Sequence, residues 1–308
     1  MKINYFCGDY NLLLVNKKFF GLWNLIRDDI DVIDYVLKYG CSNVLQYIFW
    51  LKKQNSPLIS DAKFNPNYVE NLNILLIKCC CYGRLSMVKY LVAQGVNVDA
   101  QNSRALCLAC KYGYINIAYF LMHEGANIYA NDNHPIRLAA EYGHLSIVKL
   151  LIYHNANIRA VEDSALRMAA KRNKLEVVKY IIEKIGTNYE YSDYPLAYAA
   201  GKGHIEMIEY LLSIGEKITD YAMFMAINNG HVGTVKYLID ESQSLPCISY
   251  SELAKITRKG HLEMIKLLNN RGIKINKIVN TTIINETIEK ERWEILEYFN
   301  KIGVNNNC

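Results

Sequence analysis

The sequence is short of proline and of long apolar runs. Five prolines among 308 residues exclude a collagen-like chain and Pro-rich linkers. No segment reaches 18 uncharged apolar residues, so none is long enough to span a bilayer as a helix. The first residues, Met1 to Tyr5, lack the apolar stretch and cleavage site of a signal peptide. We therefore expect a cytoplasmic protein that makes no contact with a membrane.

Neither charge nor cysteine points to a specialised class. The net charge of +5, from 35 Lys+Arg against 30 Asp+Glu, is mild, and nucleic-acid binding is not expected from it. The nine cysteines are an odd number and include the run Cys79-Cys80-Cys81, so they do not form a secreted disulfide framework. In a reducing cytosol they would be thiols. The hydrophobic fraction of 51% is that of a folded chain.

An internal repeat organises nearly the whole chain. Residues 82–91 (YGRLSMVKYL) return as residues 142–151 (YGHLSIVKLL) and again as residues 202–211 (KGHIEMIEYL). One residue anchors each copy, and from the second anchor to the eighth the spacing is 30 residues, with one step of 27. The anchors are Gly40, Gly83, Gly113, Gly143, Asn173, Gly203, Gly230, Gly260 and Glu291. We interpret residues 28–308 as about nine copies, residues 1–27 as an N-terminal cap, and the longer first step as a loop insertion near residues 52–66.

Each copy is predicted to be two short helices. After the anchor, apolar residues such as Leu145, Ile147, Val148 and Leu151 fall on one helical face. Before it, small residues such as Ala139 and Ala140 predict a first helix that another helix approaches closely. The anchor then supplies the left-handed conformation that ends the first helix. One such pair cannot bury its apolar face alone, so the sequence predicts an all-α solenoid of stacked pairs.

The copies resemble ankyrin repeats. Residues 134–144 (HPIRLAAEYGH) follow the ankyrin pattern TPLHxAAxxGH, and residues 164–170 and 194–200 follow it in register. The resemblance extends over about residues 28–308. The richness in Asn, Ile, Tyr and Lys is similar to the ankyrin arrays of giant DNA viruses of amoebae. The resemblance implies a solenoid of ankyrin-type helix pairs joined by short loops or hairpins.

Two departures from the ankyrin pattern predict local differences. The family period is about 33 residues, and the missing residues fall where the family forms a hairpin finger, so long β-paired fingers are not expected. The His that the family uses to tie the start of the first helix is replaced by Arg137 and Arg167. We therefore expect these copies to be less tightly tied than consensus repeats.

The sequence offers no candidate site for catalysis or metal binding. Cys80 and Cys110 occupy a packed slot of the first helix, which favours core thiols, and no further ligands complete a metal site around Cys107. The post-anchor histidines His144, His204, His231 and His261 recur at one register, but stacked copies lie about 10 Å apart, too far for a shared ion. Glu176, Glu206 and Glu263 fall on exposed sides of second helices. We expect no enzyme activity, no metal and no cofactor.

Protein–protein interaction is the function that we expect. The concave face of a solenoid is its extended binding surface, and the ankyrin resemblance implies contacts just before each anchor. The candidate partner-binding residues are Lys111, Tyr112, Glu141, Tyr142, Lys171, Arg172 and Lys202. If this face is unused, they are ordinary solvated positions. We expect a monomer that binds another protein, a host protein in the host cytoplasm if the chain is viral.

Two alternative functions stay open. Residues 245–248 (LPCI), followed by Glu252 and Leu253, resemble the start of an F-box, which would make the chain an adaptor that recruits a host ubiquitin ligase. The other alternative is a scaffold that binds nucleic acid, which would show binding that falls steeply with salt.

Overall fold

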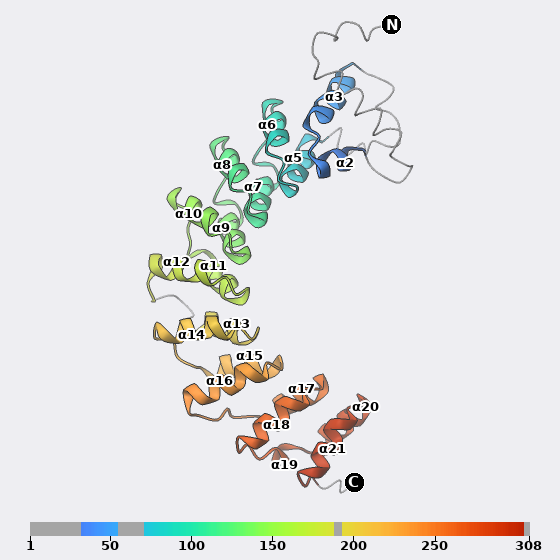
Figure 1. Cartoon of the computed structure of the whole chain (residues 1–308), viewed down its shortest axis with the longest axis vertical. Coiled ribbons are helices and arrows are strands. Elements are labelled where there is room, and N and C mark those ends of the chain that lie inside the picture. Colours follow the sequence, from blue (N-terminus) through green and yellow to red (C-terminus); the bar gives the residue numbers. More distant parts are fainter. Residues whose placement is uncertain (1–31, 55–70, 188–192, 305–308) are drawn as a thin grey trace. The chain divides into compact units, whose positions relative to one another are not determined.

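The computed structural model describes residues 32–54, 71–187 and 193–304, which form helices joined by turns (Figure 1). These residues contain no β-strand, and the predicted all-α class is confirmed. None of the described helices combines the length and the apolar character needed to cross a bilayer. The predicted cap of residues 1–27 lies outside the described residues.

The insertion predicted near residues 52–66 overlaps the end of one described helix by two residues. Helix α3 (Ser42–Lys53) continues through Lys52 and Lys53 because its apolar side, which ends at Leu51, is buried against its neighbours. Two lysines in the last turn also complement the helix dipole. Residues 55–70, which hold most of the predicted insertion, lie outside the described part of the chain.

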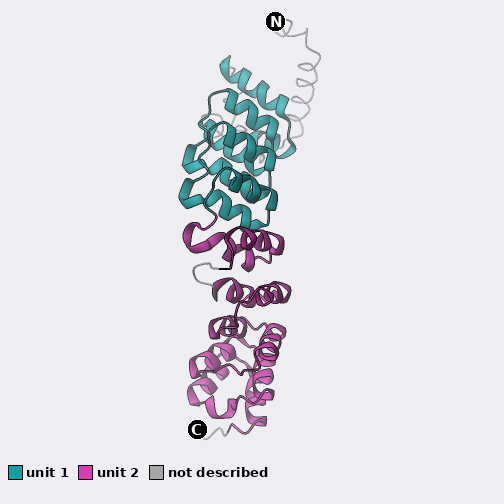
Figure 2. Cartoon of the chain, turned by 90° about the vertical axis from the view of Figure 1, so that its left-hand side faces the viewer, with its two compact units in different colours: residues 1–157 teal, residues 158–308 magenta. Residues whose placement is uncertain are grey.

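The described helices occur in pairs, distributed over two compact units, residues 1–157 and residues 158–308 (Figure 2). Unit 1 contains α2 (Val32–Tyr39) with α3, α5 (Leu72–Cys81) with α6 (Leu85–Ala93), α7 (Ala100–Tyr112) with α8 (Ile115–His123), and α9 (Ala130–Tyr142) with α10 (Leu145–Tyr153). Unit 2 contains α11 (Ala160–Lys171) with α12 (Leu175–Ile185), α13 (Asp193–Ala200) with α14 (Ile205–Ser213), α15 (Asp220–Asn228) with α16 (Val232–Ser242), α17 (Tyr250–Lys259) with α18 (Leu262–Asn270), and α20 (Thr281–Glu289) with α21 (Trp293–Lys301). A short helix, α19 (Ile275–Ile278), precedes the last pair.

Within each unit the first helices of successive pairs pack side by side. In unit 1, α7 lies between α5 and α9, while α8 lies between α6 and α10 (Figure 1). In unit 2, α13 lies between α11 and α15. The paired small residues are fully buried, as Ala139 and Ala140 show in α9, so the helices approach closely as predicted.

The anchors end the first helices in the left-handed conformation, as predicted. φ is positive at all seven anchor glycines and also at Asn173 (+56°) and Glu291 (+55°). Gly113 shows a second requirement for glycine, because a Cβ atom there would lie 2.6 Å from the imidazole ring of His144. The anchor thus combines a turn with a close approach between consecutive pairs.

A single left-handed turn lies near the start of three of the first helices, inside the bounds given for α7, α9 and α11. Residues 101–103, 131–133 and 161–163 have φ between 48° and 58°, and the turn is closed by a backbone bond such as Asn133 N–H to Tyr129 O (3.1 Å). Each non-Gly residue in this conformation costs about 1 kcal/mol or more. Since Val161 is β-branched, it fits this conformation worst.

Arginine side chains hold two of these turns, contrary to the expected weak tying. Arg137 donates from Nη2 to Asn131 O (2.9 Å), and Arg167 donates in the same way to Val161 O (2.9 Å). The expectation of looser copies is therefore wrong at these two positions. The long guanidinium side chain reaches back six residues and replaces the histidine of the family pattern.

Side chains from two of these turns also accept a bond from the backbone further along the chain. Ser103 Oγ accepts a hydrogen bond from the Asn127 N–H (2.7 Å), and Asn133 Oδ1 accepts one from the Asn157 N–H (2.8 Å). Ser103 is fully buried, so this bond also satisfies a hydroxyl that water does not reach.

A histidine after three of the anchors ties its pair to a preceding one. His144 donates from Nε2 to Lys111 O (2.9 Å), and His204 and His231 donate to Lys171 O and Gly201 O (both 3.0 Å). A carbonyl only accepts, so Nε2 carries the proton. The histidines stand at helix starts as predicted, but their side chains do not cap those helices.

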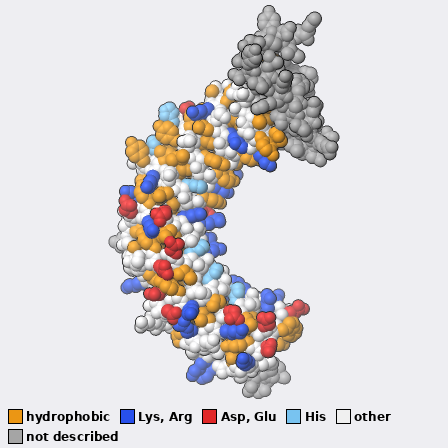
Figure 3. All heavy atoms as spheres, viewed as in Figure 1, with side chains coloured by type: hydrophobic (Ala, Val, Ile, Leu, Met, Phe, Trp, Pro, Cys, Tyr) orange, Lys and Arg blue, Asp and Glu red, His pale blue; other side chains and the backbone are white. Residues whose placement is uncertain are grey.

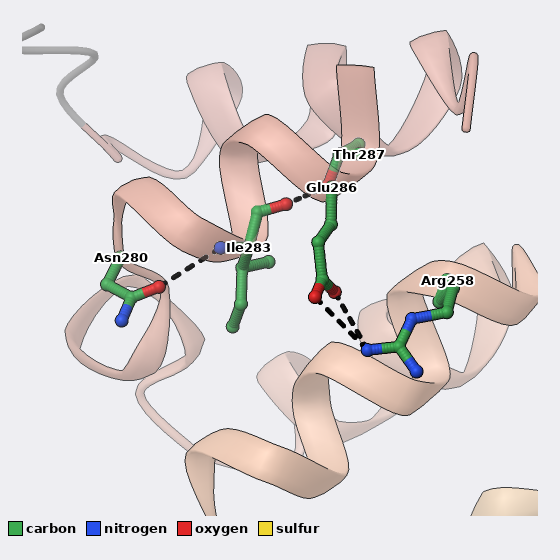
Figure 4. A network of polar contacts seen from close by, with 5 residues as sticks. All are labelled: Arg258, Asn280, Ile283, Glu286 and Thr287. Carbon is green, nitrogen blue, oxygen red and sulfur yellow. Dashed lines mark hydrogen bonds and ion pairs between the residues drawn. The ribbon is translucent and has the colours of Figure 1, made fainter. Parts of the chain in front are cut away.

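The C-terminal pairs of unit 2 are joined by a salt bridge. Arg258 of α17 donates from Nη2 to both carboxylate oxygens of Glu286 in α20, each at 3.1 Å (Figure 4). Asn280 caps the start of α20 by accepting from the Ile283 N–H (3.0 Å), and Thr287 Oγ1 donates to Ile283 O (2.5 Å) (Figure 4). The ion pair with Glu286 balances the charge of Arg258 within the fold.

Candidate functional site

The exposed side of the first helices, near the anchors, is the candidate interaction surface. We call it the first-helix face and describe it in each unit by itself. Its side chains lie on α7 and α9 in unit 1 and on α11, α13 and α15 in unit 2. The opposite sides of the same helices carry the buried small residues of the stack.

In unit 1 the structure brings three predicted residues together. Lys111 Nζ lies 5.4 Å from the ring centroid of Tyr112 and 5.3 Å from that of Tyr142, within the range of cation–π attraction. Tyr112 is 45% exposed, and its ring is 6.3 Å from that of Tyr114. Glu141, the fourth predicted residue, is half-buried on α9. The result is a lysine between two tyrosines on adjacent first helices.

In unit 2 the predicted residues are cations at the ends of first helices. Lys171, the last residue of α11, places Nζ 5.5 Å from the ring centroid of Tyr198. Arg172 and Lys202 are exposed and stand directly before their anchors. These three cations lie where α11 and α13 end.

Sequence reasoning missed a tyrosine cluster beside these cations. Tyr194 and Tyr198 of α13 have ring centroids 5.9 Å apart, and Tyr221 of α15 meets Tyr194 edge to face at 5.7 Å. Arg167 holds Tyr194 from the other side, with its guanidinium carbon 5.6 Å from the ring centroid. The i, i+4 spacing of Tyr194 and Tyr198 was the available signal.

Tyr221 carries a protonated hydroxyl at physiological pH, as a tyrosine ordinarily does. Desolvation, with Tyr198 and Tyr194 nearby, raises the pKa of its hydroxyl. The hydroxyl is therefore a neutral hydrogen-bond donor at physiological pH.

The cysteines on the first helices of unit 1 are core thiols, as predicted. Cys80 and Cys110 are fully buried, and burial raises the pKa of both thiols well above the usual value. Burial also raises the pKa of Cys107 to about 11. Thiolates of this kind do not form near neutral pH, so these side chains are not nucleophiles. In the described part of the chain, no group of three His, Cys, Asp or Glu side chains is close enough to hold a metal ion.

The glutamates of the second helices are solvated, as predicted. Glu176, Glu206 and Glu263 are exposed. Glu176 pairs with Lys179 (3.0 Å) and Glu263 with Lys266 (2.8 Å), each across one turn of its own helix. Such exposed pairs contribute little to stability and form no catalytic arrangement.

Known proteins resemble this chain in sequence and in fold. Residues 33–132 and 136–222 match the family described as ankyrin repeats (3 copies). Ankyrin repeat protein R844 of Acanthamoeba polyphaga mimivirus is 43% identical over 101 residues, which cover 33% of this chain and 46% of that protein. Ankyrin repeat protein R840 of the same virus is 36% identical over 103 residues, 33% of this chain and 19% of that protein. The matches thus span less than half of these relatives. The ankyrin repeat domain of human ASB11 matches 56% of this chain and 85% of its own, with a TM-score of 0.49 and 24% identity.

Proposed function

The chain belongs to the ankyrin-repeat family, and we propose that it is a non-catalytic protein that binds another protein through its first-helix face. The observation that carries the proposal is the exposure of tyrosines on this face. Tyr112 and Tyr221 are 45% and 40% exposed, although each belongs to a first helix whose other side is packed. Tyrosine is among the residues that dominate binding energy at protein interfaces. Because stacked helices fix these side chains beforehand, binding loses little conformational entropy.

The relatives suggest where this interaction takes place. The two compared by sequence are proteins of a virus of amoebae. We propose that the partner is a host protein, met in the cytoplasm of the infected cell, and that the chain acts as a monomer.

Site-specific photo-crosslinking of the full chain in amoeba extract tests the proposal. Benzoylphenylalanine replaces Tyr112 or Tyr221 on the first-helix face, and Tyr153, which is 81% exposed at the end of α10, is the matched control. We expect adducts with a defined protein from Tyr112, Tyr221 or both, and not from Tyr153. Adducts of equal yield from Tyr153, or none from the first-helix face, would contradict the proposal.

The ubiquitin-ligase alternative gains no support from the segment that suggested it. Residues 243–249 are not helical, and α17 packs against α15 and α20 as the first helix of a pair. Ligase subunits among the crosslinked proteins would nevertheless favour the adaptor. Capture of nucleic acid that declines steeply with salt would favour the scaffold alternative.

A further inference from the structure

We propose that unit 2 binds an acidic segment of the partner protein on one patch of its first-helix face. The patch consists of Lys171, Lys202, Tyr194, Tyr198 and Tyr221, and we call it the aromatic–basic patch. The inference rests on the proposed function and adds the chemistry of the partner. Carboxylates of the segment face the cations, and its backbone lies across the tyrosines.

The packing of three helices brings Lys171 and the three tyrosines of the patch together, and Lys202 lies two residues beyond the end of α13. α13 lies between α11 and α15, so its tyrosines are flanked by side chains from both neighbours. Lys171 of α11 reaches Tyr198, and Tyr221 of α15 reaches Tyr194. In the space-filling view, Lys and Arg side chains line the first-helix edge near α11 and α13 (Figure 3).

Arg167 belongs to the support of the patch and not to its binding surface. Its side chain is only 13% exposed, and it donates to Val161 O while lying against the ring of Tyr194. It therefore fixes the aromatic cluster in position. The cations that reach solvent are Lys171, at the end of α11, and Arg172 and Lys202, which follow α11 and α13.

Charge is separated along these helices. Carboxylates occupy the first turns, as Glu162 does in α11 and Asp220 in α15, whereas the cations stand at the anchor ends. A cation at a helix C-terminus complements the helix dipole. The position directly before the anchor does not require a cation, however. In unit 1 the same position holds Tyr82, Tyr112 and Tyr142. Directly before the anchor, unit 2 thus carries a cation in place of tyrosine at Arg172, Lys202 and Lys259, with asparagine at 229, whereas Lys171 has a counterpart in Lys111 of unit 1. The cations of unit 2 complement an acidic ligand.

The geometry of the rings favours an acidic protein segment over a nucleic acid. Base stacking requires open, parallel ring faces. Here Tyr221 stands at 70° to Tyr194, and Tyr198 is tilted by 33° to it, so the rings are not parallel. Arg167 and Lys171 also lie over the rings of Tyr194 and Tyr198. Their edges and hydroxyl groups remain for a peptide, whose carboxylates and carbonyls accept hydrogen bonds.

Fluorescence anisotropy with the full chain tests the inference. The probes are a labelled ten-residue peptide of alternating Glu and Asp, the matching Gln and Asn peptide, and single-stranded DNA of equal charge. The variant is Lys171→Glu with Lys202→Glu. The control is Lys179→Glu with Lys236→Glu, the same charge change on second helices of unit 2.

Of the three probes, we expect only the acidic peptide to bind the unmodified chain well. Its affinity should be about tenfold lower for the Lys171→Glu/Lys202→Glu variant and unchanged for the control variant. Tyr198→Ala should also weaken binding about tenfold, with the circular-dichroism spectrum of the chain unchanged. An equal loss in the control, tighter binding of DNA, or no binding of the acidic peptide would overturn the inference.

Crosslinking separates this failure from failure of the proposed function. If benzoylphenylalanine at Tyr221 captures its protein at full yield when Lys171 and Lys202 are reversed, protein binding stands and the acidic patch is wrong. If the unreversed chain gives no adduct from the first-helix face, the proposed function itself is wrong.

Discussion

The close approach of His144 to Gly113 allows the packing requirement of an anchor to be measured apart from its backbone requirement. Gly113 has φ of +81°, and a Cβ atom there would lie 2.6 Å from ring atoms of His144. Gly125, in the same unit, has φ of +93° and nothing within 4 Å of such an atom. The two Gly→Ala variants therefore share a backbone cost, and only Gly113→Ala adds a clash.

The magnitudes follow from these two terms. Alanine in the left-handed conformation costs about 1 kcal/mol, and moderate overpacking adds about 1 kcal/mol more. The energetic cost of the clash stays at the lower end of the range for overpacking because the imidazole ring of His144 can shift. At the equivalent anchor, Asn173 carries a Cβ atom, and His204 still bonds to Lys171 O at 3.0 Å. We expect Gly125→Ala to lose about 1 kcal/mol of unfolding free energy and Gly113→Ala about 2 kcal/mol.

Urea unfolding of the full chain measures both losses of unfolding free energy. The slope of this free energy against urea concentration should be the same in both variants. Hydrogen exchange at the amides of α7 and α8 then shows whether the loss is local, because repeat arrays can unfold in steps. His144→Ala alone removes the bond to Lys111 O (2.9 Å) and costs about 1 kcal/mol. The double variant Gly113→Ala/His144→Ala should lose about 1 kcal/mol less than the sum of the two single losses, because the clash with the ring is absent. Full additivity, or equal losses for Gly113→Ala and Gly125→Ala, would refute the reasoning.

Three further variants test the backbone and one buried charge. Val161→Asn should gain about 0.5–1 kcal/mol because Asn tolerates the left-handed turn, whereas Val92→Asn in the right-handed α6 should lose stability; chemical denaturation compares them. Asn173→Gly should raise the urea midpoint, since glycine has no Cβ to strain at φ of +56°, and an unchanged midpoint would mean that the anchor is unstrained. Burial raises the pKa of Glu216 from 4.5 to about 8, so unfolding free energy should fall as pH rises from 4.5 to 8, by a few kcal/mol at most. Glu216→Gln should flatten this decline, and a pH profile identical to that of the unmodified chain would contradict the burial of this carboxyl group.

The helix pairs were predictable because their signals are local and repeated. Apolar spacing after each anchor gives the second helix, and paired alanines give the packed side of the first. The left-handed turns at 101–103, 131–133 and 161–163 were not predictable in this way. Their sequences share no residue type that dictates three consecutive positive φ values, and Val161 argues against one. The stack imposes that conformation, closed by backbone bonds.

The role of Arg137 and Arg167 escaped prediction for a different reason. Loss of a family residue was interpreted as loss of its hydrogen bond, although a longer donor can reach a different acceptor. The guanidinium groups bond to carbonyls of the turn itself, Asn131 O and Val161 O. The replacement is visible only once the turn is known.

The candidate site was predicted in part. Lys111, Tyr112 and Tyr142 meet because equal register positions of consecutive first helices are neighbours in a stack. Tyr194 and Tyr198 lie one to two turns further from the anchor. An analysis limited to the two residues before each anchor therefore misses the part of the face they occupy.

The ties between pairs explain how the two units can carry different chemistry on one scaffold. The bonds from His144, His204 and His231 end on the backbone carbonyls of Lys111, Lys171 and Gly201. Every residue has a backbone carbonyl whatever its side chain. The same histidine bond can therefore form although the side chains around the three acceptors differ. Substitutions at these positions can therefore change recognition with little cost to the stack. The residue before the anchor illustrates the same freedom, being tyrosine in unit 1 at 82, 112 and 142, and in unit 2 basic at 172, 202 and 259 but asparagine at 229. Charge reversal on this face should accordingly alter binding far more than it alters stability.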